Sequence, residues 1–244
     1  MKKRLLYFLL LLAFLSNLFF VYDKLKSRNR LIELKKQNKI LVINSQSFGI
    51  KVSNYFCELR LNRHNIINIL PINYNSLVFL GDSFLEYAEI SELFHNNEFK
   101  NRGVAGETTS EIKIRLKEIL THKPKGIIIQ GGTNDILKEI PNTFTLKNFN
   151  EIIKEIRKES PKTLIYIQEI PPKVNPLFNK KSKEINIKLK EICKQNKVIF
   201  ISLTDSFTEK DGMIYKQLFS KDGIHFNGQG YLKWKEVTQK YIIN

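Results

Sequence analysis

From residue 75 onward, short apolar runs alternate with longer amphipathic stretches, and Gly, Pro or Asn residues separate them. Continuous runs of β-branched and other apolar residues are typical of strands that helices cover on both faces of a parallel sheet. The pattern therefore predicts an α/β fold with a five-stranded parallel sheet. The expected strands cover residues 77–80, 99–104, 126–130, 164–169 and 198–203.

Apolar positions three and four residues apart predict the intervening helices. Thr108 and Glu111 have the spacing of a capping box, which marks the start of one of them. Its apolar face consists of Ile112, Leu116, Ile119 and Leu120. Two more helices are expected around residues 149–156 and 185–193, and a C-terminal helix over 231–241 is expected to pack against the sheet.

The first 22 residues follow a different pattern. Residues 5–22 carry no charge, and Ser16 and Asn17 are their only strongly polar members. As a helix they would span about 27 Å, close to the hydrocarbon thickness of a bilayer. Because no small-x-small cleavage site follows, residues 1–22 are expected to be an uncleaved transmembrane anchor, with a cleaved signal peptide as the alternative.

The net charge of +16 is concentrated near this apolar segment, because residues 1–63 hold thirteen Lys or Arg against three Asp or Glu. A basic flank beside a membrane segment is attracted to anionic lipid headgroups, so we expect a membrane partner through residues 5–22 and no nucleic-acid partner. Nucleic-acid binding by the basic N-terminal region stays open as an alternative. A general richness in Lys, Asn and Ile also explains the charge. Residues 23–70 are interpreted as a basic stalk or linker and 71–244 as the folded domain.

Two cysteines are compatible with one disulfide or with two thiols. Cys193 shares a predicted helical face with Ile185, Leu189 and Ile192. This favours a buried core thiol at Cys193 and leaves Cys57 unassigned.

Three segments that follow predicted strands hold the first candidate functional groups, since ligands and reacting groups gather beyond the carboxyl ends of such strands. Ser83 lies where a strand turns into a helix, and its hydroxyl is either a nucleophile that a base activates or a helix N-cap. Gly106 lets the backbone approach a reacting atom, or is a turn residue. Asn134 offers an amide donor, or forms an Asx turn.

The fourth candidate segment is Asp222-Gly223-Ile224-His225. A carboxylate that orients one ring nitrogen of a histidine leaves the other nitrogen to accept a proton from serine. Asp222 and His225 converge if the segment turns; otherwise they are surface residues. The other histidines, at positions 64, 95 and 122, have no such neighbour in the sequence.

Together the four segments resemble the SGNH, or GDSL-like, hydrolase family, whose four blocks occur in this order over about residues 76–242. The first block matches Gly81-Asp82-Ser83, with Phe84 where the family name has leucine. The second and third blocks place the family's oxyanion glycine at Gly106 and its oxyanion asparagine at Asn134. The last block matches Asp222 and His225, with Phe226 where many members have proline.

The resemblance implies a flavodoxin-like three-layer α/β/α sandwich and hydrolysis of an ester. It implies a catalytic triad of Ser83, Asp222 and His225. It also implies an oxyanion hole made by the N–H groups of Ser83 and Gly106 and the Asn134 amide. The expected partner is a small-molecule ester, with no cofactor and no metal.

The second and third blocks look like the branch that contains platelet-activating-factor acetylhydrolases and carbohydrate O-acetylesterases. This favours a short acyl group on a carbohydrate or a lipid. An O-acyltransferase that acts on an envelope glycan and an inactive glycan- or lipid-binding module stay open as alternatives. The catalytic domain is expected outside the cytoplasm, as in secreted hydrolases. The charge pattern favours the opposite orientation, because seven Lys or Arg lie between Lys24 and Lys39 and only three precede the apolar run.

Overall fold

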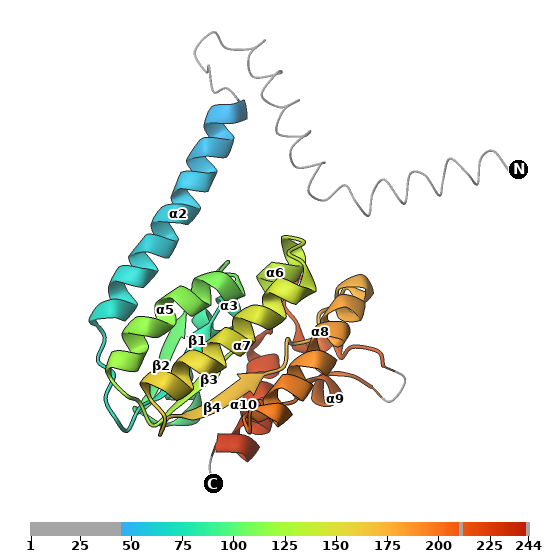
Figure 1. Ribbon diagram of the computed structural model, residues 1–244. Coiled ribbons are helices and arrows are strands. Elements are labelled where there is room, and N and C mark those ends of the chain that lie inside the picture. The colour runs from blue at the N-terminus through green and yellow to red at the C-terminus, as the bar shows by residue number, and fades with distance from the viewer. Residues whose placement is uncertain (1–44, 210–211, 243–244) are drawn as a thin grey trace, which may run out of the picture. The chain divides into compact units, whose positions relative to one another are not determined.

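The computed structural model describes residues 45–209 and 212–242 (Figure 1). The expected anchor over residues 5–22 lies outside the described residues. Among the helices that are described, none is both long and apolar enough to cross a membrane. The chain divides into two units, residues 1–62 and 63–244. Helix α2 comprises Ser45–Ile69.

The second unit contains five strands within its described part. They are β1 (Leu77–Gly81), β2 (Phe99–Gly103), β3 (Gly126–Ile129), β4 (Leu164–Gln168) and β5 (Ile199–Ile201). The longer helices are α5 (Thr109–Thr121), α7 (Asn142–Glu159), α8 (Pro176–Gln195) and α10 (Gly228–Ile242). The short helices are α3 (Ser83–Glu86), α4 (Ile90–Phe94), α6 (Thr133–Leu137), α9 (Thr204–Phe207) and the 3₁₀ turn η1 (Lys216–Leu218).

All strand pairs are parallel, and the strand order is β2-β1-β3-β4-β5. This is the flavodoxin-like order, in which the chain reverses its direction of winding between β1 and β3. The expected five-stranded parallel sheet is confirmed. Ser83 follows β1 directly, so the nucleophile candidate lies at the switch point, where binding sites of such sheets form.

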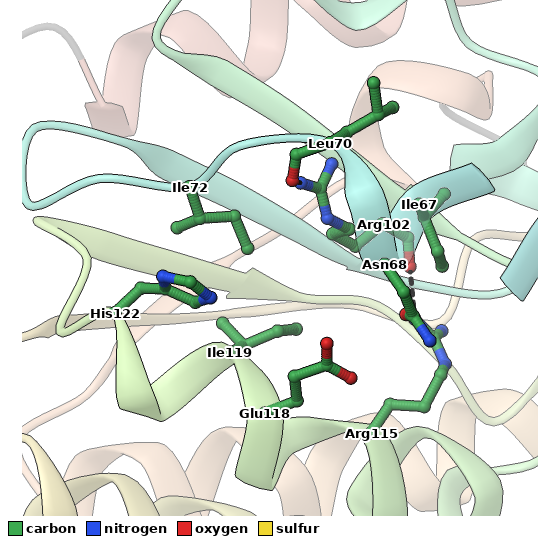
Figure 2. A pocket seen from close by; sticks show the side chains of 9 residues that line it. All are labelled: Ile67, Asn68, Leu70, Ile72, Arg102, Arg115, Glu118, Ile119 and His122. Carbon is green, nitrogen blue, oxygen red and sulfur yellow. Dashed lines mark hydrogen bonds between the residues drawn. The ribbon is translucent and has the colours of Figure 1, made fainter. Parts of the chain in front are cut away.

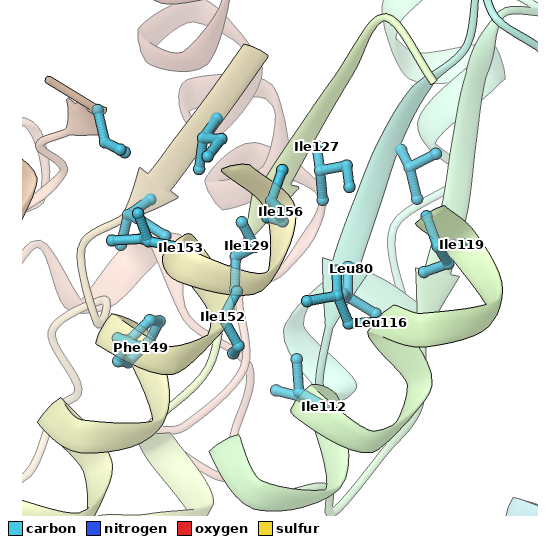
Figure 3. Packing of buried hydrophobic residues seen from close by; sticks show 14 of the residues in the cluster. Leu80, Ile112, Leu116, Ile119, Ile127, Ile129, Phe149, Ile152, Ile153 and Ile156 are labelled. Carbon is cyan, nitrogen blue, oxygen red and sulfur yellow. The ribbon is translucent and has the colours of Figure 1, made fainter. Parts of the chain in front are cut away.

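The two faces of the sheet are covered by different helices. Side chains of β1 alternate between the faces. Val78 and Leu80 pack with α5, α7 and α8, whereas Leu77 and Phe79 pack with α3, α4 and α10. Figure 3 shows the first of these layers, with the apolar sides of α5 and α7 against Leu80 of β1 and against Ile127 and Ile129 of β3. The alternation gives two cores, one on each face.

Local signals behave as the sequence predicts at several positions. Thr108 caps α5, and its N–H donates to the Glu111 carboxylate at 2.8 Å. The C-terminal helix places Trp234 edge-on against Phe79 of β1, with ring centroids 6.1 Å apart. Cys193 is a buried free thiol, as expected, and Cys57 is free and exposed.

The last strand is shorter than the sequence predicts. The apolar run extends to Leu203, but β5 ends at Ile201. The reason is the carboxylate of Glu169, which accepts hydrogen bonds from the N–H groups of Leu203 at 2.6 Å and of Thr204 at 2.8 Å. A side chain therefore takes the backbone donors that a longer strand would have given to its neighbour.

Candidate active site

The end of β1 positions Ser83. Gly81 leaves no space for a side chain, since a Cβ there would lie 2.3 Å from the Gln130 carbonyl oxygen. The N-cap of α3 is Asp82, whose carboxylate accepts from the N–H of Phe84 at 2.9 Å. Ser83 is thus the first residue of α3 and not its cap, so its half-buried hydroxyl is available for another contact.

That contact is with His225. Ser83 Oγ lies 2.8 Å from His225 Nε2, and His225 Nδ1 lies 2.6 Å from Asp222 Oδ2. With the ring proton on Nδ1, facing the carboxylate, Nε2 is the acceptor for the serine hydroxyl. The structure brings Ser83 into contact with His225, 142 positions later in the sequence, and His225 into contact with Asp222.

Asp222 uses its second oxygen to hold the turn. Asp222 Oδ1 accepts from the backbone N–H groups of Ile224 at 2.8 Å and His225 at 3.0 Å. Partial burial acts to raise the pKa of Asp222, but the hydrogen bonds from the ring and backbone of His225 outweigh it and lower that pKa. The carboxylate therefore stays ionised while it orients the ring.

Gly106 and Asn134 lie beside each other at the same edge of the sheet. Asn134 Nδ2 donates to the carbonyl oxygen of Glu107 at 2.9 Å, and Lys138 Nζ donates to that of Gly106 at 3.0 Å. An amide nitrogen carries two hydrogens, so this bond orients the second one of Asn134. Gly106 has a φ of +78°, although a Cβ there would meet nothing within 4 Å. Its requirement for glycine is conformational.

A buried aspartate that the sequence reasoning missed joins these two segments. The carboxylate of Asp135 accepts from the N–H of Thr109 at 2.9 Å and from the hydroxyls of Thr109 at 2.5 Å and Thr145 at 3.1 Å. It ties the start of α5 to α6, and with it the segment of Gly106 to that of Asn134. An acidic residue directly after Asn134 is the only trace of this role in the sequence.

A buried ion pair supports the ends of β1 and β2. Glu107 is 1% exposed, and its two carboxylate oxygens accept from Arg115 Nε at 2.9 and 2.8 Å. Arg115 also donates to the carbonyl oxygens of Arg102 at 2.9 Å and Gly81 at 3.1 Å. His64 Nε2 lies 3.2 Å from Glu107 as well, a partner far from it in the sequence.

Figure 2 shows the bond from Arg115 to Arg102 beside a small cavity. The cavity has a volume of 20 Å³, and Ile67, Ile119 and His122 are among the residues that line it. That volume suits about one water molecule. It is a packing feature of α5, and its lining contains none of the predicted site residues.

Aromatic residues around the Asp222–His225 segment lie either in the core or at the surface. Phe219 and Phe226 are buried, and Phe226 stacks on Phe207 with centroids 4.3 Å apart. Phe226 is therefore a core residue. The ring that contacts His225 belongs to Tyr87, with centroids 4.9 Å apart and 54% of Tyr87 exposed. The sequence reasoning missed Tyr87 as a residue at the site entrance.

Burial raises the pKa of Asp82 to about 6, against the opposing effects of the Phe84 N–H and of the charge on Lys173. Between about pH 4 and pH 6 the folded state therefore keeps a proton that the unfolded chain releases, so stability falls as pH rises. As the pH rises from 4 to 7, we expect the free energy of unfolding of Asp82→Asn to increase by roughly 2 kcal/mol relative to that of wild type. Urea unfolding of both proteins at several pH values measures this difference. A difference that stays constant would contradict the prediction.

The family of the chain follows from its similarity to a known family model. The model of the GDSL-like lipase/acylhydrolase family matches residues 79–233. The chain belongs to this family. It is therefore an ester-hydrolysing enzyme, and the expected resemblance is confirmed. No curated protein matches the chain significantly.

Several solved structures share the fold. A Streptococcus pneumoniae protein provisionally described as a platelet activating factor is 24% identical with a TM-score of 0.70, covering 82% of this chain and 99% of that one. A GDSL-like lipase from Bacteroides thetaiotaomicron is 19% identical with a TM-score of 0.66, covering 75% and 97%. A family 3 carbohydrate esterase from Clostridium thermocellum is 20% identical with a TM-score of 0.58, covering 69% and 95%. At these identities the likeness concerns the fold.

The described residues of this GDSL hydrolase contain no group of three or more His, Cys, Asp or Glu side chains that could hold a metal ion. The arrangement at the end of β1 consists of a hydroxyl, an imidazole and a carboxylate in hydrogen-bond contact. Such a chain of groups can move a proton from serine to histidine and back.

Proposed function

We propose that this GDSL hydrolase is a serine esterase that cleaves a short-chain acyl ester through an acyl-enzyme on Ser83. The observation that carries the proposal is the unbroken contact of Ser83 Oγ with His225 Nε2 and of His225 Nδ1 with Asp222. His225 takes the proton of Ser83 as the hydroxyl attacks the ester carbonyl. It then donates this proton to the leaving alcohol, and a water activated by His225 releases the acid.

In this proposal, the oxyanion of the tetrahedral intermediate is held by the N–H groups of Ser83 and Gly106 and by Asn134. The Asn134 amide is held by the Glu107 carbonyl oxygen, which supports a donor that is oriented before the substrate binds. Preorganised donors stabilise developing charge without a reorganisation cost during the reaction.

We expect Asn134→Ala to lower kcat about 10²- to 10³-fold, because one donor to the oxyanion is lost while nucleophile and base remain. Steady-state kinetics on an activated acetyl ester measures the effect. Asn196→Ala serves as a matched control, since its amide donates to the carbonyl oxygen of Ile192 near the C-terminal end of α8. A loss below about threefold in Asn134→Ala would remove Asn134 from the oxyanion hole.

A fluorophosphonate probe tests the nucleophile, and a substrate panel tests the ester. The probe is expected to label wild-type protein at the peptide that contains Ser83, as mass spectrometry would show. Acetyl esters of 4-nitrophenol, acetylated sugars and longer acyl esters then rank the substrates, and acetylated sugars are favoured because solved relatives of this fold include a carbohydrate esterase. An absence of labelling in folded protein would support an inactive binding module. Accumulation of transferred ester in place of free acid would identify an acyltransferase.

We also propose that residues 5–22 anchor the enzyme in a membrane with the catalytic domain outside the cytoplasm. The uncharged apolar run supports this. Cys57 offers a direct test, because its thiol is exposed whereas that of Cys193 is buried. A membrane-impermeant maleimide is expected to label Cys57 in intact cells that produce the full chain. Labelling only after lysis would contradict the proposed orientation.

A further inference from the structure

Lys173 is a buried cation next to the turn that carries Asp222 and His225. It lies between β4 and α8, and it is only 2% exposed. Its ammonium donates to the carbonyl oxygen of Ile224 at 2.8 Å. Ile224 directly precedes His225, so this bond acts on the backbone that sets the position of the imidazole. Burying an ammonium group costs free energy, so we do not expect this side chain to be buried without a role.

The residue after Lys173 forms a second hydrogen bond to the same turn. The N–H of Val174 donates to the carbonyl oxygen of Gly223 at 2.9 Å. Gly223 has a φ of +66°, and a Cβ there would lie 3.1 Å from Val174 Cβ. The turn and the β4–α8 connection therefore fit closely over two consecutive residues, Gly223 and Ile224.

The backbone of Lys173 is itself fixed by the first turns of α8. Its N–H donates to Asn179 Oδ1 at 2.8 Å, and Asn179 Nδ2 donates back to its carbonyl oxygen at 2.7 Å. The ammonium also lies over the rings of Phe84 at 5.9 Å and Phe178 at 6.0 Å. Aromatic faces attract a cation at such distances. The side chain is thus held at both ends.

Two carboxylates face this cation from different elements. Asp82 precedes Ser83 at the N-cap of α3, and Asp222 lies in the turn before α10. Burial lowers the pKa of Lys173 to about 8, while the charges of Asp82 and Asp222 act to raise it. Tyr87 is a further ionisable group here, and its ring contacts the imidazole in a tilted arrangement, with centroids 4.9 Å apart. Lys173 is the positive member of the group around His225.

We propose that Lys173 is a positioning residue of the active site: its ammonium holds the Ile224 carbonyl and so sets His225 against Ser83, and its charge balances Asp82 and Asp222. The inference rests on the proposed serine-esterase function. If the cation is removed, the two carboxylates favour a protonated imidazole. The base then becomes available only at higher pH, so the acid limb of the kcat/KM profile moves upward in pH.

The test compares Lys173→Met, which keeps the length and removes the charge, with Lys173→Arg, which keeps the charge. We expect Lys173→Met to lower kcat about 10- to 100-fold with KM changed by less than about twofold, because the ring is misplaced. Its acid limb is expected to move up by roughly half a pH unit or more. Lys173→Arg is expected to lose some kcat but to keep the wild-type acid limb. Lys181→Met, an exposed lysine of α8, is the matched control and should change neither quantity.

Circular dichroism first establishes that each variant is folded. A folded Lys173→Met with wild-type kcat and pH profile would overturn the proposal. A loss of kcat with the same acid limb as wild type would also overturn the electrostatic part and leave a packing role. If Lys173→Met does not fold, Lys173→Arg decides, because a shifted acid limb in that variant contradicts the charge argument. Failure of the serine-esterase function itself would appear separately, as wild-type protein that the fluorophosphonate does not label.

Discussion

Replacing Ser83 by alanine is expected to lower kcat for ester hydrolysis by about 10⁵- to 10⁶-fold. Without the hydroxyl no acyl-enzyme forms, and the remaining oxyanion donors support only a residual rate above that in water. The fold should be retained, because Asp82 and not Ser83 caps α3 through the N–H of Phe84. The loss therefore reports on chemistry and not on stability.

The measurement combines kcat on an activated acetyl ester with fluorophosphonate labelling and thermal unfolding. Ser91→Ala is the matched control, since its hydroxyl contacts only the carboxylate of Glu92 on the surface of α4 in the described structure. The control should keep full activity and full labelling. If Ser83→Ala retained more than about a tenth of wild-type kcat, the nucleophile would lie elsewhere and the proposed mechanism would fail.

The positions of the strands and of the candidate catalytic residues could be predicted from the sequence because both depend on local patterns. Buried parallel strands have continuous apolar runs in the sequence, and the polar residues that follow these runs lie at one edge of the sheet. Ser83 and Asn134 follow β1 and β3, which are neighbours in the sheet. Their location at the same edge of the sheet therefore needs only the strand order of this fold. The pairing of Asp222 with His225 follows from a short turn, which is also a local feature.

Residues whose role depends on a distant partner could not be predicted. In the sequence, Lys173 is an ordinary lysine after two prolines. Its burial depends on contacts with Ile224 and Phe84, which are distant in the sequence. Glu107 likewise lies against His64, which is far from it in the sequence. Tyr87 gains its place through contact with His225 across the fold. In each case the cost of burying a charge, or the approach of two rings, is set by tertiary packing and not by the local pattern.

Replacing His225 by alanine is expected to lower kcat as far as Ser83→Ala does, about 10⁵- to 10⁶-fold, because an unactivated serine hydroxyl is a weak nucleophile. Asp222→Asn should cost less, roughly 10⁴-fold, since Asp222 orients the ring and does not react. The same kinetic assay measures all three variants. His122→Ala, at the C-cap of α5, is the control that loses an imidazole outside the site and should keep wild-type kcat.

The double variant Ser83→Ala/His225→Ala separates a cooperating unit from two independent contributions. If serine and histidine act only together, as the 2.8 Å contact between Ser83 Oγ and His225 Nε2 implies, the second substitution removes nothing further. The double variant should then have the kcat of either single variant within about threefold. Multiplied losses would mean that His225 assists the reaction without Ser83, for example by activating a water directly on the ester. The proposed acyl-enzyme would then be wrong even though both residues lie in the active site.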